Sequence, residues 1–267
     1  MPAKILGLDI ETSPNICFTW GLFKQNIAIN QIVKPGGTLC WGAKWFGDKE
    51  VLFNSTYVPN QKDLTKSELE IALYNQYYDM MEEIWYLLDE ADIVIHYNGK
   101  KFDIPTLNRE FVQLGWPPPS TYKQIDLYHV VRRQFRFASN KLDFICQQLG
   151  LGNKVQHKGM DLWAECMEGI PSAWKVMKEY NIQDVNLMEP LYEILVPWIP
   201  NHPNMGLWIH NDEEATCPKC GSTHLHKKGK ERTQTMTYQR YLCLGCGATP
   251  RGRKSLHSPR AGLLVGG

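Results

Sequence analysis

The chain has 267 residues, of which 43% are hydrophobic and 21% charged, a composition typical of a globular protein with a substantial buried core. No apolar run approaches the length of a membrane-spanning helix, and the first residues lead into a predicted strand without room for a signal peptide. We therefore expect a cytoplasmic protein with no membrane partner.

The net charge of +1 hides a split between two parts of the chain. Residues 1–210 carry 19 Lys and Arg against 24 Asp and Glu, a net of −5, whereas residues 211–267 carry 10 against 4, a net of +6. Such asymmetry indicates a separate basic module, often one that binds nucleic acid. We expect a domain over residues 1–200, a linker over 201–210, a small module over 211–256 and a flexible tail over 257–267.

Residues 4–12 are predicted to form a buried strand, because the segment is short, apolar and stopped by Ser13-Pro14. Side chains alternate along a strand, so the apolar residues at even positions share one face and Asp9 and Glu11 share the other. Burying two unpaired carboxylates is costly, and a bound cation would offset that cost. The alternative is an edge strand with both acids in water.

Further elements follow in chain order. Strands are expected at Ile16–Trp20, Thr38–Phe46 and Val51–Asn54, the last two as an antiparallel hairpin. Ser67 is the expected N-cap of a long amphipathic helix, with Glu70 completing a capping box. A short apolar strand at Asp92–His96 comes next, and a right-handed crossover would place it beside the first strand.

A helix from Asp103 to about Leu114 then begins at a strand-to-helix junction. Asp103 is either an ordinary N-cap or a ligand at the carboxyl end of the sheet, where ligands tend to bind. Residues 120–170 are expected to be helical and irregular, with helices at Asp126–Phe135 and from a Ser139 cap to Gly150.

Lys154 and Lys158 lie in the next predicted loop, where their charges either contact phosphates or are solvated. The last helix of the domain begins near Ser172 and carries Tyr180 and Asp184 four residues apart, hence on one face. Pro190 predicts a kink or an early end of this helix.

Asp9, Glu11, Asp103 and Asp184 lie on three separate elements that can face one cleft. Four carboxylates facing one another repel unless hard cations neutralise them, and Mg²⁺ and Mn²⁺ take such oxygen ligands. A pair of these ions is a recognised arrangement for in-line attack at phosphorus.

Three motifs carry a resemblance to a known family: Asp9-x-Glu11, Asn98-x-x-x-Phe102-Asp103 and Tyr180-x-x-x-Asp184. In order and rough spacing they resemble the DEDD (DnaQ-like) 3′–5′ exonuclease superfamily, in its Tyr-bearing DEDDy branch. Residues 142–154 are similar to a stretch in the exonuclease domains of family B DNA polymerases. Over about residues 4–200, the resemblance implies an α/β, ribonuclease H-like fold with a mixed sheet flanked by helices.

The resemblance also implies roles for individual residues. Asp9, Glu11, Asp103 and Asp184 would hold two Mg²⁺ or Mn²⁺ ions, with Asp9 bridging, and Tyr180 would orient the attacking water. Nucleoside 5′-monophosphates would be released one at a time from a DNA 3′ end, with single-stranded ends favoured. Two further residues are candidates for nucleic-acid contact: Asn98 at the strand end, and Phe102 as either a base-stacking wedge or a core residue.

Four cysteines form two pairs, Cys217/Cys220 and Cys243/Cys246, separated by 22 residues. Two CxxC pairs, each followed by Gly, can bring four thiolates onto one structural Zn²⁺, and the spacing resembles a zinc ribbon. Redox chemistry is the alternative, but it needs only one such pair. Thr235–Leu242 is the expected ribbon strand. Basic residues of this module expected to contact nucleic acid are Lys227, Lys228, Arg240, Arg251 and Arg253.

The sequence leaves several functions open beside a 3′–5′ exonuclease. These are an exoribonuclease, a transposase-like endonuclease on the same fold and a non-catalytic DNA-binding protein. DNA is the expected partner, with RNA as an alternative and replication or repair proteins as candidate associates. The ribbon would either bind nucleic acid or dock on protein.

Overall fold

The computed structural model describes residues 2–209, 214–257 and 262–264, and the chain forms two compact units. Residues 4–190 make up one unit, and residues 191–267 with the first three residues make up the other. The division falls earlier than the predicted linker at 201–210. Residue 210 of that linker, residues 211–213 of the predicted ribbon and residues 258–261 and 265–267 of the predicted tail lie outside the described residues, so the domain boundaries and the tail stay predictions.

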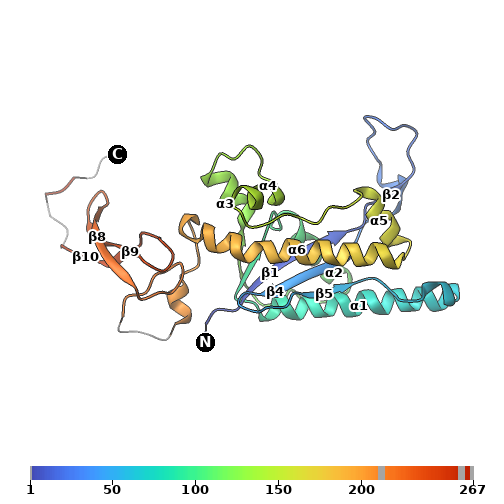
Figure 1. Ribbon diagram of the computed structural model, residues 1–267, viewed down its shortest axis with the longest axis horizontal. Helices are drawn as coiled ribbons and strands as arrows, with labels where there is room; N and C mark the ends of the chain where they lie inside the picture. Colours follow the sequence, from blue (N-terminus) through green and yellow to red (C-terminus); the bar gives the residue numbers. More distant parts are fainter. Residues whose placement is uncertain (1, 210–213, 258–261, 265–267) are drawn as a thin grey trace. The chain divides into compact units, whose positions relative to one another are not determined.

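A mixed five-stranded sheet forms the centre of the larger unit (Figure 1). Its strand order is β5-β4-β1-β6-β7, with β1 (Ile5–Thr12), β4 (Thr38–Trp45), β5 (Leu52–Ser55), β6 (Ile93–His96) and β7 (Lys123–Asp126). β1 pairs antiparallel with β4 and parallel with β6, so the strand that carries the two acids is central. The predicted mixed sheet and its parallel crossover are therefore confirmed.

Helices cover both faces of this sheet (Figure 1). They are α1 (Lys66–Glu90), α2 (Asp103–Gln113), α3 (Leu127–Gln134), α4 (Leu142–Gln148), α5 (Met160–Met167) and α6 (Pro171–Leu195). α1 and α2 pack on one face, where they share a core with β1, and α5 and α6 pack on the other, against the start of β4. The architecture is thus the expected α/β arrangement.

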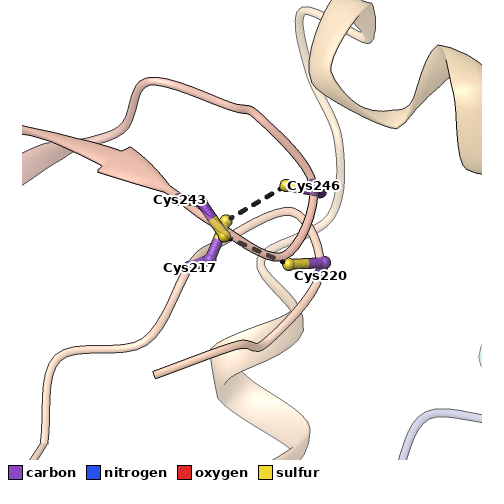
Figure 2. A group of neighbouring side chains, drawn as sticks. All are labelled: Cys217, Cys220, Cys243 and Cys246. Atoms are coloured by element: carbon purple, nitrogen blue, oxygen red, sulfur yellow. Dashed lines mark hydrogen bonds between the residues drawn. The ribbon is translucent and has the colours of Figure 1, made fainter. Parts of the chain in front are cut away.

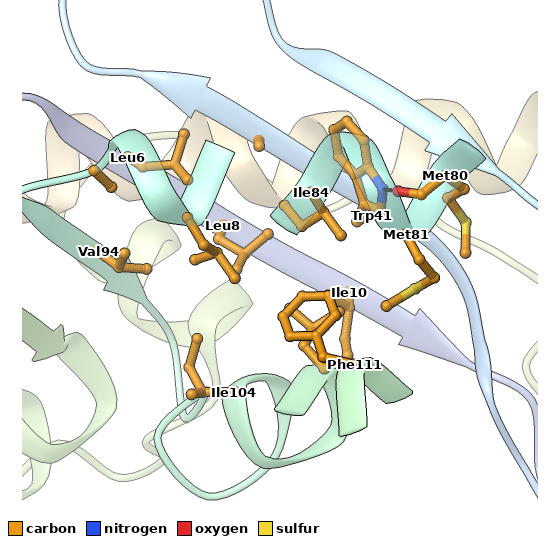
Figure 3. Packing of buried hydrophobic residues seen from close by; sticks show 14 residues of the cluster. Leu6, Leu8, Ile10, Trp41, Met80, Met81, Ile84, Val94, Ile104 and Phe111 are labelled. Carbon is orange, nitrogen blue, oxygen red and sulfur yellow. Dashed lines mark hydrogen bonds between the residues drawn. The ribbon is translucent and has the colours of Figure 1, made fainter. Parts of the chain in front are cut away.

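The core beneath α1 and α2 fixes which face of β1 is buried in apolar contacts (Figure 3). Leu6, Leu8 and Ile10 are at most 2% exposed and point into this core. Trp41 closes it from β4, with its indole N–H donating to the Met80 carbonyl over 2.8 Å. Because these apolar side chains occupy one face, Asp9 and Glu11 project from the opposite face, as the alternation predicts.

Several local predictions were wrong. The expected strand Ile16–Trp20 is only a short β2 (Ile16–Cys17), paired with β3 (Ile32–Lys34). The N-cap of α1 is Thr65, which forms the capping box with Glu68, two residues earlier than predicted. Thr65 and the predicted Ser67 both stand three residues before a Glu, but Thr65 is in the extended conformation of a cap, while Ser67 lies inside the helix.

Other differences concern the middle of the larger unit. β7 lies where no strand was predicted, and the N-cap of α4 is Lys141 rather than Ser139. α5 lies within the stretch that was expected to be helical and irregular. α6 does not end at Pro190 but continues to Leu195. A buried helix can retain an internal proline when its packing outweighs the lost backbone hydrogen bond.

The smaller unit contains a three-stranded sheet in the order β10-β9-β8. Its strands are β8 (Leu225–Arg232), β9 (Thr237–Cys243) and β10 (Arg251–Ser255), and β9 accounts for the strand predicted at Thr235–Leu242. Two short 3₁₀ turns precede the sheet, at Val196–Trp198 and Met205–Trp208. Among the described residues, no helix combines the length and the apolar character needed to cross a bilayer.

Candidate active site

Three of the four predicted carboxylates converge at one point of the larger unit. Asp9 and Glu11 project from β1, and Asp184 projects from α6, which crosses the same face of the sheet. One carboxylate oxygen from each residue lies within 4.8 Å of the others. Residues 9 and 184, remote in sequence, therefore share one site.

Asp103, the fourth predicted acid, lies next to this group without joining it. It is the first residue of α2 and is only 4% exposed. Its Oδ1 accepts a hydrogen bond from the Ile10 backbone N–H over 3.1 Å. This bond joins the start of α2 to β1 at the residue between Asp9 and Glu11. Asp103 is thus not the capping residue of α2; Phe102 precedes the helix without a side-chain cap.

Burial and mutual repulsion shift the titration of these acids upward. The pKa of Asp9 is raised well above its usual range, mainly by burial and then by the charges of Asp103 and Asp184. Burial, followed by the charge of Asp184, raises the pKa of Glu11 to about 8. Burial raises the pKa of Asp103 to about 7. Raised pKa values of this kind are found at functional sites, and a bound cation would stabilise the charged carboxylates.

Tyr180 lies one helical turn before Asp184 and faces the same group of acids. Its hydroxyl oxygen is 3.3 Å from the Lys154 ammonium, which also forms an ion pair with the Asp184 carboxylate. Burial and the nearby charge of Asp184 raise the pKa of Tyr180, so the phenol keeps its proton. The rings of His157 and Trp163 pack edge-on against Tyr180, with centroids 4.8 and 6.1 Å away.

Asn181 is a site residue that the sequence reasoning missed. This fully buried side chain donates from Nδ2 to Asp9 Oδ2 over 2.8 Å and so fixes the orientation of that carboxylate. Gly42 on β4 leaves the space it needs, since a Cβ at Gly42 would lie 2.4 Å from Asn181 Oδ1. A glycine inside a predicted strand is the one signal for such a close approach.

A cleft of about 680 Å³ opens onto the acids. Asp9, Tyr180 and Asp184 line it, together with Lys154. Asn98 lines it as well, with its backbone N–H held by Asp126 Oδ1 over 2.9 Å. Other lining residues are Tyr97, Tyr128, Asn140, Lys141, Leu142, Asp143 and His157.

Two predicted nucleic-acid contacts do not line this cleft. Phe102 is 45% exposed beside the start of α2, so the reading of it as a core residue is wrong. Lys158 forms an exposed ion pair with Glu165 over 3.3 Å. Their proposed contacts with nucleic acid stay predictions.

The donor set suits hard divalent cations. Carboxylate oxygens are the ligands that Mg²⁺ and Mn²⁺ prefer, and three are already grouped. Asp184 Oδ1 is buried and has no hydrogen-bond partner among the described residues, whereas Oδ2 carries the ion pair to Lys154. A buried, unpartnered carboxylate oxygen is costly unless a further ligand completes it.

The four predicted metal-ligating cysteines also converge, in the smaller unit (Figure 2). Their sulfur atoms lie within 4.8 Å of one another, at 3.7 Å for Cys217 and Cys246 and 3.5 Å for Cys220 and Cys243. Zn–S bonds of about 2.3 Å in a tetrahedron imply sulfur separations of about 3.8 Å, so the cluster matches a zinc site.

Glycines shape the two loops that hold these cysteines. Gly221 and Gly247 have φ of 76° and 78°, and their N–H groups donate to the carbonyls of Cys217 and Cys243. A left-handed residue at this point turns the chain back, so that both thiols of a pair face the same point.

The basic residues predicted to contact nucleic acid lie on the three strands of the smaller sheet. Lys227 and Lys228 are exposed on β8, and Arg253 is exposed on β10. Arg240 on β9 donates to the Lys228 carbonyl over 3.2 Å. Arg251 on β10 lies 4.1 Å above the Tyr238 ring and 3.5 Å from Glu231.

Three comparisons relate the chain to known proteins. No curated protein matches the chain. Among solved structures, the family B DNA polymerase from the hyperthermophilic archaeon Pyrobaculum calidifontis has 17% sequence identity and a TM-score of 0.49, over 74% of this chain and 25% of the polymerase. The chain therefore spans about a quarter of that polymerase.

A family profile gives the assignment. It matches residues 48–196, a stretch that includes Asp103, Tyr180 and Asp184 but begins after β1. The match covers more than half of the chain and agrees with the mixed sheet flanked by helices. The chain belongs to the RNase H superfamily.

Proposed function

We propose that the protein is a metal-dependent 3′–5′ exonuclease that acts on DNA and favours single-stranded ends. The observation that carries this proposal is the convergence of Asp9, Glu11 and Asp184 beside the Tyr180 hydroxyl, at a cleft in an RNase H superfamily fold. The motif resemblance to the DEDDy exonucleases supports the same activity.

Asp9, Glu11 and Asp184 would hold the two Mg²⁺ or Mn²⁺ ions, with Asp103 as the fourth acid of the motif. The ions, when bound, would lower the pKa of a water and neutralise charge on the scissile phosphate. Asn181 keeps the Asp9 carboxylate aimed at the site through its hydrogen bond. Asp103 holds β1 in place by accepting a hydrogen bond from the Ile10 N–H, between Asp9 and Glu11.

Tyr180 would position the attacking water. Its raised pKa keeps the phenol neutral at physiological pH, so that it can accept a hydrogen bond from water and donate one to a phosphate oxygen. The Lys154 ammonium lies between Tyr180 and Asp184, where it would neutralise charge on the phosphate of an entering strand. Both residues thus orient and neutralise rather than transfer a proton.

The cleft favours a single strand over a duplex. Tyr97 and Tyr128 form an edge-on aromatic pair in its wall, with ring centroids 5.9 Å apart, and Asn98 offers an amide beside them. Aromatic faces and amides suit unpaired bases, which expose their flat surfaces and edges. Product release as 5′-monophosphates follows if the phosphate stays with the leaving 3′-terminal nucleotide.

For the smaller unit we propose a structural Zn²⁺ bound by Cys217, Cys220, Cys243 and Cys246, in a ribbon that holds nucleic acid. The sulfur separations support the zinc site, and the exposed lysines of β8 support phosphate contact. This unit would then raise the local concentration of strands near the nuclease.

The activity is tested by incubating the full chain with Mg²⁺ or Mn²⁺ and 3′- or 5′-labelled DNA and RNA, in single- and double-stranded form. A 3′ label should appear at once as mononucleotide, and a 5′ label should shorten by single steps. Circular single-stranded DNA should survive; its cleavage would identify an endonuclease instead. Faster release from RNA would identify an exoribonuclease.

A matched pair of variants tests the site. Asp184→Asn should abolish metal-dependent nucleotide release, because it removes one of the converging charges while keeping the side-chain size. Asp79→Asn makes the same chemical change at an exposed position on α1 and should leave release unchanged. Equal activity of Asp184→Asn and the unchanged protein would refute the proposed site.

A further inference from the structure

A protruding hairpin follows directly after the acid-bearing strand. We define the arm as residues 14–36, which include β2 and β3 (Figure 1). Its base is closed by a hydrogen bond of 2.8 Å from the Ser13 N–H to the Gly37 carbonyl. Further along, Phe18 N–H donates to the Gln31 carbonyl over 2.9 Å, and the Gln31 side chain returns a bond of 3.0 Å to the Phe18 carbonyl. The arm is therefore a formed hairpin.

Large apolar side chains cover the outer half of the arm and are open to water. Their exposed fractions lie between 74% and 99%, with Trp20 at the upper limit. They are Phe18, Trp20, Leu22, Phe23 and Ile29. Five large, exposed apolar side chains on one hairpin of a globular protein indicate a binding surface.

The charge around these side chains indicates what they bind. Residues 12–47 contain no Asp or Glu, although residues 1–210 as a whole carry a net charge of −5. The arm has Lys24 and Lys34 and several Asn and Gln side chains. Aromatic faces beside cations and amides, with acids excluded, complement a chain of bases and phosphates.

The arm is also continuous with the proposed catalytic site. A hollow of about 330 Å³ lies between its base and α5, lined by Thr12, Ser13, Pro14, Gly159, Met160 and Trp163. Thr12 follows Glu11 directly, and the Trp163 ring packs against Tyr180 with centroids 6.1 Å apart. The Trp163 ring therefore connects Tyr180, beside the acids, with the hollow at the base of the arm.

We propose that the arm is a stacking platform for single-stranded nucleic acid, on which the bases upstream of the terminal nucleotide lie against Trp20 and Phe23. This inference rests on the proposed nuclease function, since it uses the acids as the place where the strand ends. The arm adds length-dependent affinity, because only a strand that extends past the hollow reaches it.

The test compares full-length chains that all carry Asp184→Asn, so that the strands stay intact during binding. Fluorescence anisotropy measures the affinity for labelled 20-nucleotide and 4-nucleotide strands, as oligo-dT and as oligo-rU. Trp20→Ala with Phe23→Ala should weaken binding of the long strands about 10-fold or more, since each lost stack weakens binding severalfold. Binding of the short strands should not change, and equal losses for dT and rU would show that the platform serves both.

Two controls separate stacking from other roles. Tyr86→Ala removes an aromatic side chain that is 60% exposed on α1, outside the arm, and should leave both affinities unchanged. Trp20→Phe with Phe23→Tyr keeps flat rings and should restore long-strand binding. The slope of log affinity against log salt should stay the same in all arm variants, because no phosphate contact is removed.

Three results would overturn the platform. One is unchanged long-strand affinity in the double alanine variant. Another is an equal loss of affinity for long and short strands. The third is that the unchanged protein sediments as a dimer and the double alanine variant as a monomer, which would make the arm a self-association surface. If the unchanged protein releases nucleotides but the arm variants bind strands normally, only the platform proposal is refuted. If the arm variants bind long strands weakly but the unchanged protein releases no nucleotides, only the nuclease proposal is refuted.

Discussion

Glu11 offers a test of the acid cluster that does not depend on catalysis. In the folded protein, burial and then the Asp184 charge raise its pKa from 4.5 to about 8. The unfolded chain therefore releases this proton first as pH rises, and the fold loses stability between pH 4.5 and about 8. A pH unit well inside that window is worth about 1.4 kcal/mol, and the slope is smaller near each end. From pH 5 to pH 8 this single carboxyl therefore lowers the free energy of unfolding by about 3 to 4 kcal/mol.

Glu11→Gln removes the ionisation while keeping an oxygen that can still accept the hydrogen bond from Trp163. In buffer without Mg²⁺ or Mn²⁺, the variant should therefore become more stable than the unchanged protein as pH rises. The difference in the free energy of unfolding should grow by about 3 to 4 kcal/mol between pH 5 and pH 8. The site would thus lose function and gain stability through the same substitution.

Urea unfolding followed by tryptophan fluorescence at pH 5, 6, 7 and 8 measures this difference. Glu70→Gln, at an exposed position on α1, is the matched control and should follow the unchanged protein at every pH. Adding Mn²⁺ at pH 8 should stabilise the unchanged protein more than Glu11→Gln. Parallel pH profiles for Glu11→Gln and the unchanged protein would show that this carboxyl is not held in a repulsive, buried group.

Three further outcomes are expected. Asn181→Ala should raise the Mn²⁺ concentration needed for half-maximal nucleotide release about 10- to 100-fold, because Asp9 loses its orienting partner. Gly42→Ala crowds the same amide and should also raise the Mn²⁺ requirement. An unaltered Mn²⁺ requirement in both variants would contradict the orienting role of Asn181. Cys217→Ser should reduce bound zinc, measured by elemental analysis, from one ion per chain towards none, and full retention would contradict the cluster. Replacing Lys227, Lys228 and Lys230 on β8 by Ala should make the slope of log affinity against log salt shallower by about 2 to 3 for duplex DNA. An identical slope would indicate that β8 contacts protein rather than DNA.

Sequence reasoning succeeded where the signal is local and repeated. The alternation in residues 4–12 correctly places Asp9 and Glu11 on the face opposite the apolar core. The four-residue spacing of Tyr180 and Asp184 correctly places both on one face of a helix. The convergence of Asp9, Glu11 and Asp184 then follows once the strand and the helix pack together.

It failed where the element is short or where the signal has more than one solution. β7 has four residues, Lys-Gln-Ile-Asp, with a single apolar side chain, so its pairing with β6 rather than its own pattern makes it a strand. Thr65 and Ser67 both satisfy the capping-box spacing, and only the backbone conformation selects between them.

Asn181 and the arm show a further limit. Asn181 acts at the site through its hydrogen bond to the Asp9 carboxylate, 172 residues away in sequence. Nothing in the segment around Asn181 indicates that contact. Of the exposed apolar residues of the arm, Phe18 and Trp20 lie in the segment predicted as a strand, and only their exposure in the folded chain distinguishes them from core. Tertiary neighbours decide both features.

The central position of β1 in the sheet also governs how the acids respond to fluctuations. Because β1 is hydrogen-bonded on both sides, its amide protons should exchange with solvent only when the whole unit opens, unlike those of an edge strand. Chelation and rebinding of cations would then occur on a scaffold whose backbone stays closed. The carboxylates would then be able to lose and regain the proposed cations many times within the lifetime of a single native molecule.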